Sequence, residues 1–413
     1  MNICLLCRNF HQDSGGIETF TAHYARALSE AGHSVHILCQ DEGDLNRGRL
    51  GQNIFVHHVP FDDDLFPGVW KIERFLPLND LRYSKAVAKK IESVQAEYAL
   101  DIVETFDYFR QGFIYARRHN RLPVFFRLHG WSRKWGHTPF PTPFPTQETL
   151  GREMGCDPIS TTLSLKERIS WAMQRDTLLK ADGLAAVSRD TADFVKQVWR
   201  INRNIKTIYN AVDSQIFSPN GKKDPCQILF AGRLIPRKGI DVMAQALPLV
   251  IKEFPDVQLA VAGADAFSSD GKKNSQMLRE AIGAKNFEYL GTLPPDQLKI
   301  WLRKSSILIM PSYDEGLPLS ALEAMASGCA LIASTAGGLK ELIHHEKDGL
   351  LVNPGDAMML AKAILRLLQD EALRLKLAAN GLKKVRTAYS YQKLVEESLK
   401  AYQEAIKAFG GGV

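Results

Sequence analysis

The sequence predicts an α/β protein made of two domains, each built around a parallel β-sheet. The chain has 413 residues, which exceeds the size at which a single hydrophobic core keeps growing, so two domains are expected. Short apolar runs alternate with longer amphipathic patterns, and this alternation is typical of the βαβ units that form parallel sheets. A polar stretch near the middle of the chain separates two series of such units.

Composition agrees with ordinary globular folding and argues against several other classes of protein. Hydrophobic residues make up 45% and charged residues 24% of the chain, unlike a disordered protein. The net charge of +6 is small for a nucleic-acid-binding protein of this length. Six scattered cysteines suit a reducing compartment, and Cys4 and Cys7 are better explained by packing in a strand than by a redox or metal site. No run reaches the roughly 18 to 20 apolar residues of a membrane span, so we expect a cytoplasmic protein.

The first series of units opens with a strand over residues 3–7, a loop that contains Gly15 and Gly16, and an amphipathic helix over residues 17–31. Gly32 is suited to end that helix, because glycine adopts the left-handed conformation that helix ends often need. Further strands are expected at 35–39, 54–59, 102–105, 124–128, 184–187 and 205–208.

The second series follows a linker over residues 218–224, which contains Pro219 and Gly221. We therefore expect an N-terminal domain over residues 1–215 and a C-terminal domain over residues 216–389. The strands of the second series are expected at 228–231, 257–262, 287–290, 307–310 and 330–333, and its helices at 240–254, at 319–326 and from 357 onward.

Basic side chains follow the first strand of the second series. Arg233 and Lys238 lie five residues apart on a loop bounded by Gly232 and Gly239, and a helix follows directly. Fixed positive charge next to a helix N-terminus can bind a diphosphate. An ordinary solvated basic loop is the alternative interpretation.

Two glutamates follow another strand of the second series. Glu315 lies in the loop after the strand at 307–310, and Glu323 lies in the next helix. Eight helical residues span about 12 Å, so the two carboxylates cannot hold one small group but can hold two ends of a nucleotide sugar. For either residue alone, a favourable interaction with the helix N-terminus is the simpler explanation.

Together with several other segments, this glutamate pair resembles the glutamate, seven residues, glutamate signature of the family-4 retaining glycosyltransferases, which have the GT-B fold. The segments fall in the order found in that family, and the resemblance covers nearly the whole chain. Besides the pair, it is carried by Gly15-Gly16, by Gly32-His33-Ser34-Val35, by Ile208 to Asp213, by Ala231-Gly232-Arg233 with Lys238-Gly239, and by Gly337-Gly338 with Glu341.

The resemblance implies two Rossmann-like domains that face one another across a cleft, with a C-terminal helix at about residues 390–413 that packs back on the first domain. It also implies a hexosyltransferase that moves a sugar from a UDP- or GDP-sugar to an alcohol with retention at the anomeric carbon. The acceptor classes left open are a glycan, a lipid-linked sugar and a small molecule. No cofactor and no essential divalent metal ion are expected, since cations of the chain would neutralise the diphosphate.

The resemblance also assigns roles to individual residues. Arg233 and Lys238 would neutralise the departing diphosphate. Glu315 would bind the transferred sugar, and Glu323 would bind the ribose hydroxyls. The other site residues implied are Gly316, Leu317 and Leu319 on the donor side, Gly16 close to the phosphates, and His129 close to the sugar.

Some features depart from the family pattern. Ala211 stands where Gly is usual, and Leu317-Pro318 stands where Phe-Gly is frequent. Pro318 has no N–H to donate to a sugar hydroxyl, so the identity of the donor sugar stays open. The string Asp62-Asp63-Asp64 matches the metal signature of a different glycosyltransferase fold, but its acidic, proline-flanked surroundings favour a solvated loop.

One stretch of the first domain is locally basic. From Arg110 to Lys134 there are seven Arg or Lys residues and no acidic residue, and alternating prolines predict an extended loop from Trp131 to Thr146. This region is either a solvated face or a surface for an anionic acceptor or for the inner face of a membrane. Weaker candidates for the acceptor side or the domain interface are Ser188 and Asn210.

Three other functions compete with a glycosyltransferase. A sugar-nucleotide epimerase can share the two-domain architecture, and a non-catalytic protein could bind nucleotide sugars without turnover. A dehydrogenase would need a Gly-x-Gly-x-x-Gly turn after a strand, and neither half of the sequence has one. The oligomeric state is left open.

Overall fold

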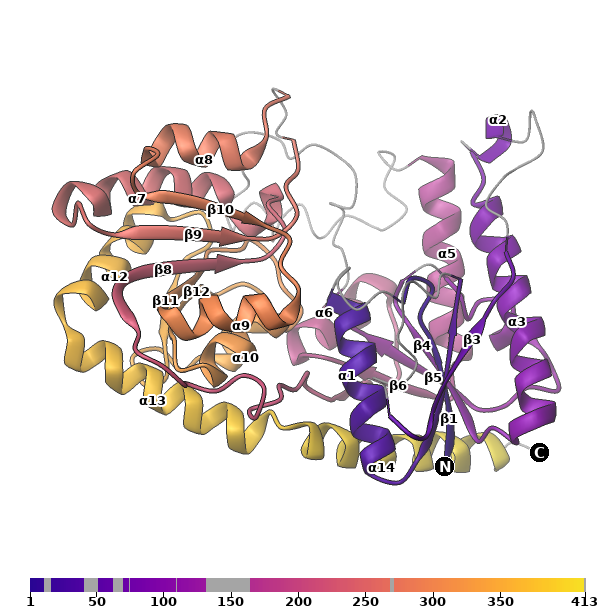
Figure 1. Ribbon diagram of the computed structural model, residues 1–413. Helices are drawn as coiled ribbons and strands as arrows, with labels where there is room; N and C mark the ends of the chain where they lie inside the picture. Colours follow the sequence, from indigo (N-terminus) through magenta and orange to yellow (C-terminus); the bar gives the residue numbers. More distant parts are fainter. Residues whose placement is uncertain are drawn as a thin grey trace. The chain divides into compact units, whose positions relative to one another are not determined.

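The protein is described here from a computed structural model, shown in Figure 1. The structure describes residues 1–10, 16–40, 51–61, 70–73, 75–108, 110–130, 164–267 and 271–411. These residues form two compact units, each with its own parallel sheet. The prediction of two α/β domains built on parallel sheets is therefore confirmed.

The first unit contains the described residues up to Gly130, from Ser164 to Ile208 and from Gln392 onward. Its seven-stranded sheet has the order β3-β2-β1-β4-β5-β6-β7, and all of its strand pairs are parallel. The elements are β1 (Asn2–Leu6), α1 (Gly16–Glu30), β2 (Ser34–Cys39), β3 (Ile54–His58), α2 (Trp70–Glu73), α3 (Leu78–Tyr98), β4 (Ile102–Phe106), the 3-10 turn η2 (Tyr115–Arg117), β5 (Val124–Leu128), α5 (Leu165–Lys180), β6 (Gly183–Ala186), α6 (Arg189–Trp199), β7 (Lys206–Thr207) and α14 (Tyr391–Gly410).

Helices cover both faces of the first sheet, because successive strand residues point to opposite sides. On one face, side chains such as Phe126 and Leu128 pack against α3, α5 and α6. On the other face, α1 and α14 lie on the sheet, and the rings of Phe125 and Tyr402 have centroids 5.0 Å apart. A Cβ atom added to Gly183 would come within 2.8 Å of Ala405, so α14 packs directly on the strands.

The second unit runs from Tyr209 to Tyr391 in the described residues. Its six-stranded sheet has the order β10-β9-β8-β11-β12-β13, again with parallel pairs throughout. The elements are β8 (Asp224–Ala231), the 3-10 turn η3 (Pro236–Lys238), α7 (Ile240–Glu253), β9 (Gln258–Ala262), α8 (Asn274–Ile282), β10 (Phe287–Gly291), α9 (Pro295–Lys304), β11 (Ser305–Met310), α10 (Leu319–Ala326), β12 (Ala330–Ser334), α11 (Leu339–Leu342), β13 (Leu350–Val352), α12 (Ala357–Gln369) and α13 (Glu371–Ala388).

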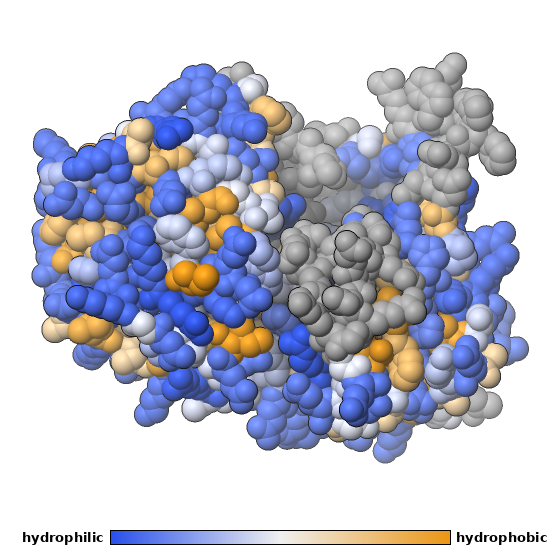
Figure 2. All heavy atoms as spheres, viewed as in Figure 1, coloured by the Kyte–Doolittle hydropathy of each residue, from blue (hydrophilic) through white to orange (hydrophobic). Residues whose placement is uncertain are grey.

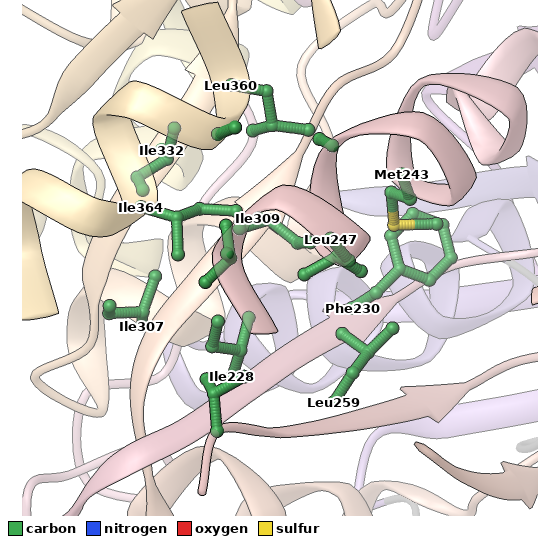
Figure 3. Close-up of a cluster of buried hydrophobic side chains, with 14 of the residues drawn as sticks. Ile228, Phe230, Met243, Leu247, Leu259, Ile307, Ile309, Ile332, Leu360 and Ile364 are labelled. Carbon is green, nitrogen blue, oxygen red and sulfur yellow. The ribbon is translucent and has the colours of Figure 1, made fainter. Parts of the chain in front are cut away.

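The core of the second unit lies between its sheet and helices α7, α8 and α12 (Figure 3). Ile228, Ile307 and Ile309 on the strands contact Leu247 of α7 and its neighbours in this cluster. The next residue along each strand faces the opposite side, where α9 and α10 lie. The short strand β13 is absent from the predicted strands, because a run of three residues cannot be told from a loop by its pattern.

Figure 2 shows that the described surface on the face drawn is mainly hydrophilic, with small separate apolar areas. The largest exposed fractions among apolar side chains belong to single residues such as Phe267, at 68%. Within the described part of the chain, no helix combines the length and the apolar character needed to cross a membrane.

Candidate functional site

Most of the predicted donor-side residues lie at one edge of the second sheet. Strands β8 and β11 are parallel neighbours, so their carboxyl ends meet at the same edge. Arg233 and Lys238 follow β8, and Glu315 follows β11. Loops at the carboxyl ends of parallel strands are the usual place for ligands in open α/β sheets, so the fold gathers these residues where binding is expected.

A close ion pair joins the two loops. The Lys238 Nζ donates to Glu315 Oε1 over 2.5 Å, and the side chains are 15% and 6% exposed. The Ser312 hydroxyl donates to the same oxygen over 2.8 Å. Glu315 Oε2 accepts no hydrogen bond from any described residue. The pair is therefore held firmly on one side and keeps an acceptor oxygen and ammonium protons for a ligand.

The charges of this pair are coupled. Burial raises the pKa of Glu315, but the cations Lys238 and Arg237 and the hydrogen bonds from Lys238 and Ser312 outweigh burial, so the pKa lies below its ordinary value. Burial is the largest influence on Lys238 and, together with the cations Arg237 and Arg233, lowers its pKa although Glu315 raises it. The Glu315 carboxyl therefore favours its ionised form, which an ammonium group on Lys238 stabilises in turn.

The backbone around Glu315 is fixed from two further directions. Gly337 has φ +52°, and a Cβ atom there would lie 1.7 Å from the Glu315 carbonyl oxygen, so only glycine fits this contact. The Asn210 Nδ2 donates to the Leu317 carbonyl over 2.7 Å. Sequence reasoning placed Asn210 on the acceptor side or the domain interface and missed this brace, since no local pattern links two residues so far apart.

Glu323 lies one turn into α10 and is only 8% exposed. Its carboxyl group has no hydrogen-bond or ion-pair partner among the described residues. Burial raises its pKa to about 7. An unpaired carboxyl buried next to a strand end has strong unused acceptor capacity, which suits a ligand that brings hydroxyl donors.

The rest of the donor-side set lies on the loops after β8 and β11 and at the start of α10. Arg233 is exposed, and its side chain makes no ion pair in the described ranges. Leu317 is buried, whereas Gly316 and Leu319 are partly exposed. Pro318 takes the N-cap position of α10 with φ −71°.

The two predicted residues of the first unit lie at the carboxyl edge of its sheet. Gly16 opens α1, and a Cβ atom added there would meet nothing within 4 Å. His129 directly follows β5, and its main-chain N–H donates to Asp107 Oδ1 over 3.1 Å. The His129 ring packs between Phe20 and Phe106, with ring centroids 4.3 and 5.1 Å away. The backbone and ring of His129 are thus both fixed.

The side chain of His129 is uncharged near neutral pH. Burial, and to a smaller extent the nearby cation Arg127, lower its pKa well below the ordinary value of 6.5. Its Nε2 atom is buried and has no hydrogen-bond partner in the described structure. Ser188, in contrast, has a structural role: its hydroxyl accepts from the Thr191 N–H over 3.1 Å and caps α6.

The basic stretch after Arg110 is internally neutralised where the structure describes it. Each of its five described arginines pairs with an acidic side chain from elsewhere in the first unit. The pairs are Arg110–Asp80, Arg117–Asp176, Arg118–Glu92, Arg121–Asp182 and Arg127–Glu104. This part therefore offers less charge to an anionic surface than its sequence indicates.

Three predicted features lie outside the described residues. These are Gly15, the acidic string at 62–64 and the loop at 131–146. Within the described ranges, no group of three or more His, Cys, Asp or Glu side chains is arranged to hold a metal ion.

Comparison with known families assigns both units. Residues 14–216 match the family "Glycosyltransferase Family 4", and residues 212–384 match the family "Glycosyl transferases group 1". The two matches meet near residue 214 and together cover most of the chain. The chain is a glycosyltransferase whose second unit matches group 1.

Curated relatives of this glycosyltransferase are distant. An uncharacterized glycosyltransferase of Methanocaldococcus jannaschii is 26% identical over 94% of this chain and 95% of its own length. Another from the same organism is 29% identical, but the match spans 50% of this chain and 55% of that protein. The D-inositol 3-phosphate glycosyltransferase of Xylanimonas cellulosilytica is 24% identical over 96% of this chain and 93% of its own length.

Solved structures agree with the fold of this glycosyltransferase. Sucrose-phosphate synthase from Thermosynechococcus elongatus has a TM-score of 0.75 at 20% identity and covers 98% of this chain and 99% of its own. Anabaena HepE in complex with UDP and glucose has a TM-score of 0.69 at 18% identity, with coverage of 97% and 98%. The predicted GT-B family resemblance is confirmed.

Proposed function

We propose that this glycosyltransferase moves a hexose from a UDP- or GDP-sugar to an alcohol with retention at the anomeric carbon. The observation that carries the proposal is the Lys238–Glu315 pair, whose ammonium and free carboxylate oxygen lie at the carboxyl edge of the second sheet. A diphosphate needs cations, and a sugar needs acceptors for its hydroxyl groups. This pair supplies both at one place.

The roles follow from the unused hydrogen-bonding capacity of each residue. Lys238 and Arg233 would neutralise the diphosphate as it leaves, which stabilises charge that develops in the transition state. Glu315 would accept from hydroxyls of the transferred sugar, and the unpaired Glu323 from the ribose hydroxyls. Gly316, Leu317 and Leu319 would line the donor.

The reaction needs no separate general base in this proposal. The bond between the anomeric carbon and the phosphate oxygen breaks, and the acceptor oxygen bonds to the same face of that carbon. The acceptor proton passes to the departing phosphate oxygen. The positive charge that a metal ion would supply comes from Lys238 and Arg233, so we propose transfer without an essential divalent metal ion.

In the first unit, the uncharged His129 would hydrogen-bond the sugar through its unpaired Nε2. Gly16 would approach the phosphates with its backbone. The open space at this position is compatible with this role, since no atom of the described residues lies within 4 Å of where its Cβ would be.

A donor screen tests the proposal. UDP-glucose, UDP-galactose, UDP-N-acetylglucosamine and GDP-mannose are each incubated with the wild-type protein, and release of UDP or GDP is measured. One donor is expected to be hydrolysed slowly without acceptor. Glu315→Ala and Lys238→Ala should lose at least about 100-fold of this activity, while Lys299→Ala, which breaks an exposed pair with Asp296, should keep it.

The configuration of the product separates the rival functions. Proton NMR of the first transfer product should show the anomeric configuration of the donor. An isomerised nucleotide sugar formed without acceptor would indicate an epimerase. Binding of a nucleotide sugar with no product from any donor would indicate a non-catalytic protein, and full activity of Glu315→Ala would overturn the assigned site.

A lipid-linked acceptor is tested separately. Pelleting with vesicles that contain anionic lipid, at low and at high salt, measures surface charge attraction. Because the described arginines of the basic stretch are paired, we expect weak, salt-insensitive pelleting. Strong binding to vesicles that is lost at high salt would indicate a charged surface outside those pairs, and would favour a membrane-bound acceptor.

A further inference from the structure

A buried polar cluster lies behind His129 in the first unit. Arg127 and His129 are two residues apart at the end of β5, so their side chains share one face of the sheet. The Arg127 Nε donates to Glu104 Oε1 over 2.5 Å, and both side chains are fully buried. Most buried ion pairs serve no reaction, so the contacts of this pair decide its role.

Helix α14 completes the cluster. The Arg127 Nη2 donates to the Ser398 hydroxyl over 2.9 Å and to the Tyr24 hydroxyl over 3.3 Å. The Tyr402 hydroxyl donates to Glu104 Oε2 and lies 3.0 Å from the Tyr24 hydroxyl. Both oxygens of Glu104 are thus engaged, and Arg127 is held by groups from α1, β4 and α14.

The cluster reaches His129 through one aromatic ring. The Arg127 guanidinium carbon is 5.7 Å from the centroid of Phe20, and the Phe20 ring packs on the His129 ring at 4.3 Å. The same guanidinium contributes to lowering the pKa of His129, after burial. The other groups that face His129 are Asp107 and Phe106 at the end of β4.

We propose that Arg127 is a positioning residue for His129, acting through Phe20 and held in place by α14. This inference rests on the proposed function, in which His129 binds the sugar. Arg127 fixes the ring that supports the imidazole and disfavours its protonation, so Nε2 stays available as a neutral hydrogen-bonding group. Helix α14, more than 260 residues from β5 in sequence, thereby becomes part of the sugar-side site.

The first test removes both charges and keeps the volume. In the double variant Glu104→Gln with Arg127→Met, no charge is left unpaired, and such replacements of a buried pair are often neutral for stability. NMR of the imidazole signals, assigned with His129→Asn, follows protonation between pH 5 and 8. We expect His129 to titrate closer to the ordinary value of ~6.5, whereas in the wild-type protein it stays neutral over this range.

The second test leaves the ion pair intact. Tyr402→Phe removes one hydroxyl from α14 and keeps its ring. The matched control is Glu404→Gln, which breaks a solvent-exposed pair between α14 and Lys206. We expect Tyr402→Phe to move the His129 ring signals and to lower kcat about three- to tenfold with the donor KM unchanged, by analogy with lost positioning contacts. Glu404→Gln should do neither.

The readouts separate this inference from the proposed function. If no donor is turned over, the function fails, but the NMR titration still decides whether Arg127 controls His129. Unchanged His129 signals in both Tyr402→Phe and the double variant would overturn the inference and leave a purely structural cluster. If the double variant does not fold, Tyr402→Phe against Glu404→Gln decides alone.

Discussion

Each unit of this glycosyltransferase contains a buried ion pair, and the two pairs differ in what surrounds them. In the first unit, Arg127 and Glu104 are 0% exposed, and both carboxylate oxygens of Glu104 have donors from the chain. In the second unit, Lys238 and Glu315 are 15% and 6% exposed, and Glu315 Oε2 has no donor among the described residues. The carboxylate of Glu104 is completed by the protein, although Arg127 Nη1 is buried without a hydrogen-bond partner in the described structure, and the carboxylate of Glu315 is left incomplete.

The difference shows how burial should be interpreted in this fold. Two buried charges cost desolvation energy wherever they lie. Where the chain itself supplies donors to both carboxylate oxygens, as for Glu104, the pair sets the structure around it. Where a pair at a strand end keeps hydrogen-bonding groups without a partner in the chain, as in the pair of Lys238, a ligand is expected to supply the partner. Substitutions in the two pairs should therefore separate effects on activity from effects on stability.

The largest effect is expected on catalysis. Lys238→Met should lower kcat/KM for the donor at least about 1000-fold, or more than about 4 kcal/mol, because it removes charge that stabilises the leaving diphosphate. Steady-state release of UDP or GDP measures this. Lys299→Met is the control on a partly exposed lysine of the same unit, and a loss below tenfold in Lys238→Met would contradict the role.

The next largest effect is expected on stability, where the Arg127 variant should lose more than the Lys238 variant. Arg127→Met leaves Glu104 buried without its cation and should lower the free energy of unfolding by about 3 to 4 kcal/mol. Urea denaturation measures it. Lys238→Met should lose less than half as much, since Glu315 lies closer to solvent and keeps the Ser312 hydrogen bond. Equal losses in the two variants would remove the distinction between the pairs.

A pH effect follows from Glu323. Burial raises its pKa from 4.5 to about 7, so between these values the folded protein holds a proton that the unfolded chain has lost. Stability should therefore fall as pH rises through this window, and Glu323→Gln should abolish that part of the fall, about 2 kcal/mol between pH 5 and 8. Urea denaturation at both pH values tests this, and parallel losses in wild type and variant would refute it.

The smallest effect concerns the brace on the donor loop. Asn210→Ala removes the hydrogen bond to the Leu317 carbonyl, and we expect the donor KM to rise about fivefold, near 1 kcal/mol. Substrate titration measures the change. Asn210→Asp, which cannot donate from its side chain when ionised, should behave like the alanine variant; normal KM values in both would show that the loop needs no brace.

The sequence predicted the fold well because the informative signals were local. Apolar runs such as that at 124–128 predicted strands whose ends differ little from those in the structure. Lys238 and Glu315 were predicted as site residues because each follows a strand. Their direct contact was not predicted, since it depends on β8 and β11 being neighbours in the sheet. The roles of the selected residues remain proposals.

Long-range contacts explain what sequence reasoning could not reach. Arg127 sits in a run that reads as an apolar strand, and its partners Ser398 and Tyr402 lie in the last helix. The same limit affected the basic stretch after Arg110, whose arginines looked unpaired because every acidic partner comes from another element. Charge counted along a sequence does not show which charges a fold neutralises.

Isothermal titration with UDP and with GDP tests the central distinction most directly. One nucleotide should bind wild type and the Glu104→Gln, Arg127→Met double variant with equal affinity, because both oxygens of Glu104 already have donors from the protein. The same nucleotide should bind Lys238→Met at least about 30-fold more weakly, or 2 kcal/mol. Equal binding to wild type and Lys238→Met, or equal losses in both variants, would contradict the assignment of the second pair to the donor.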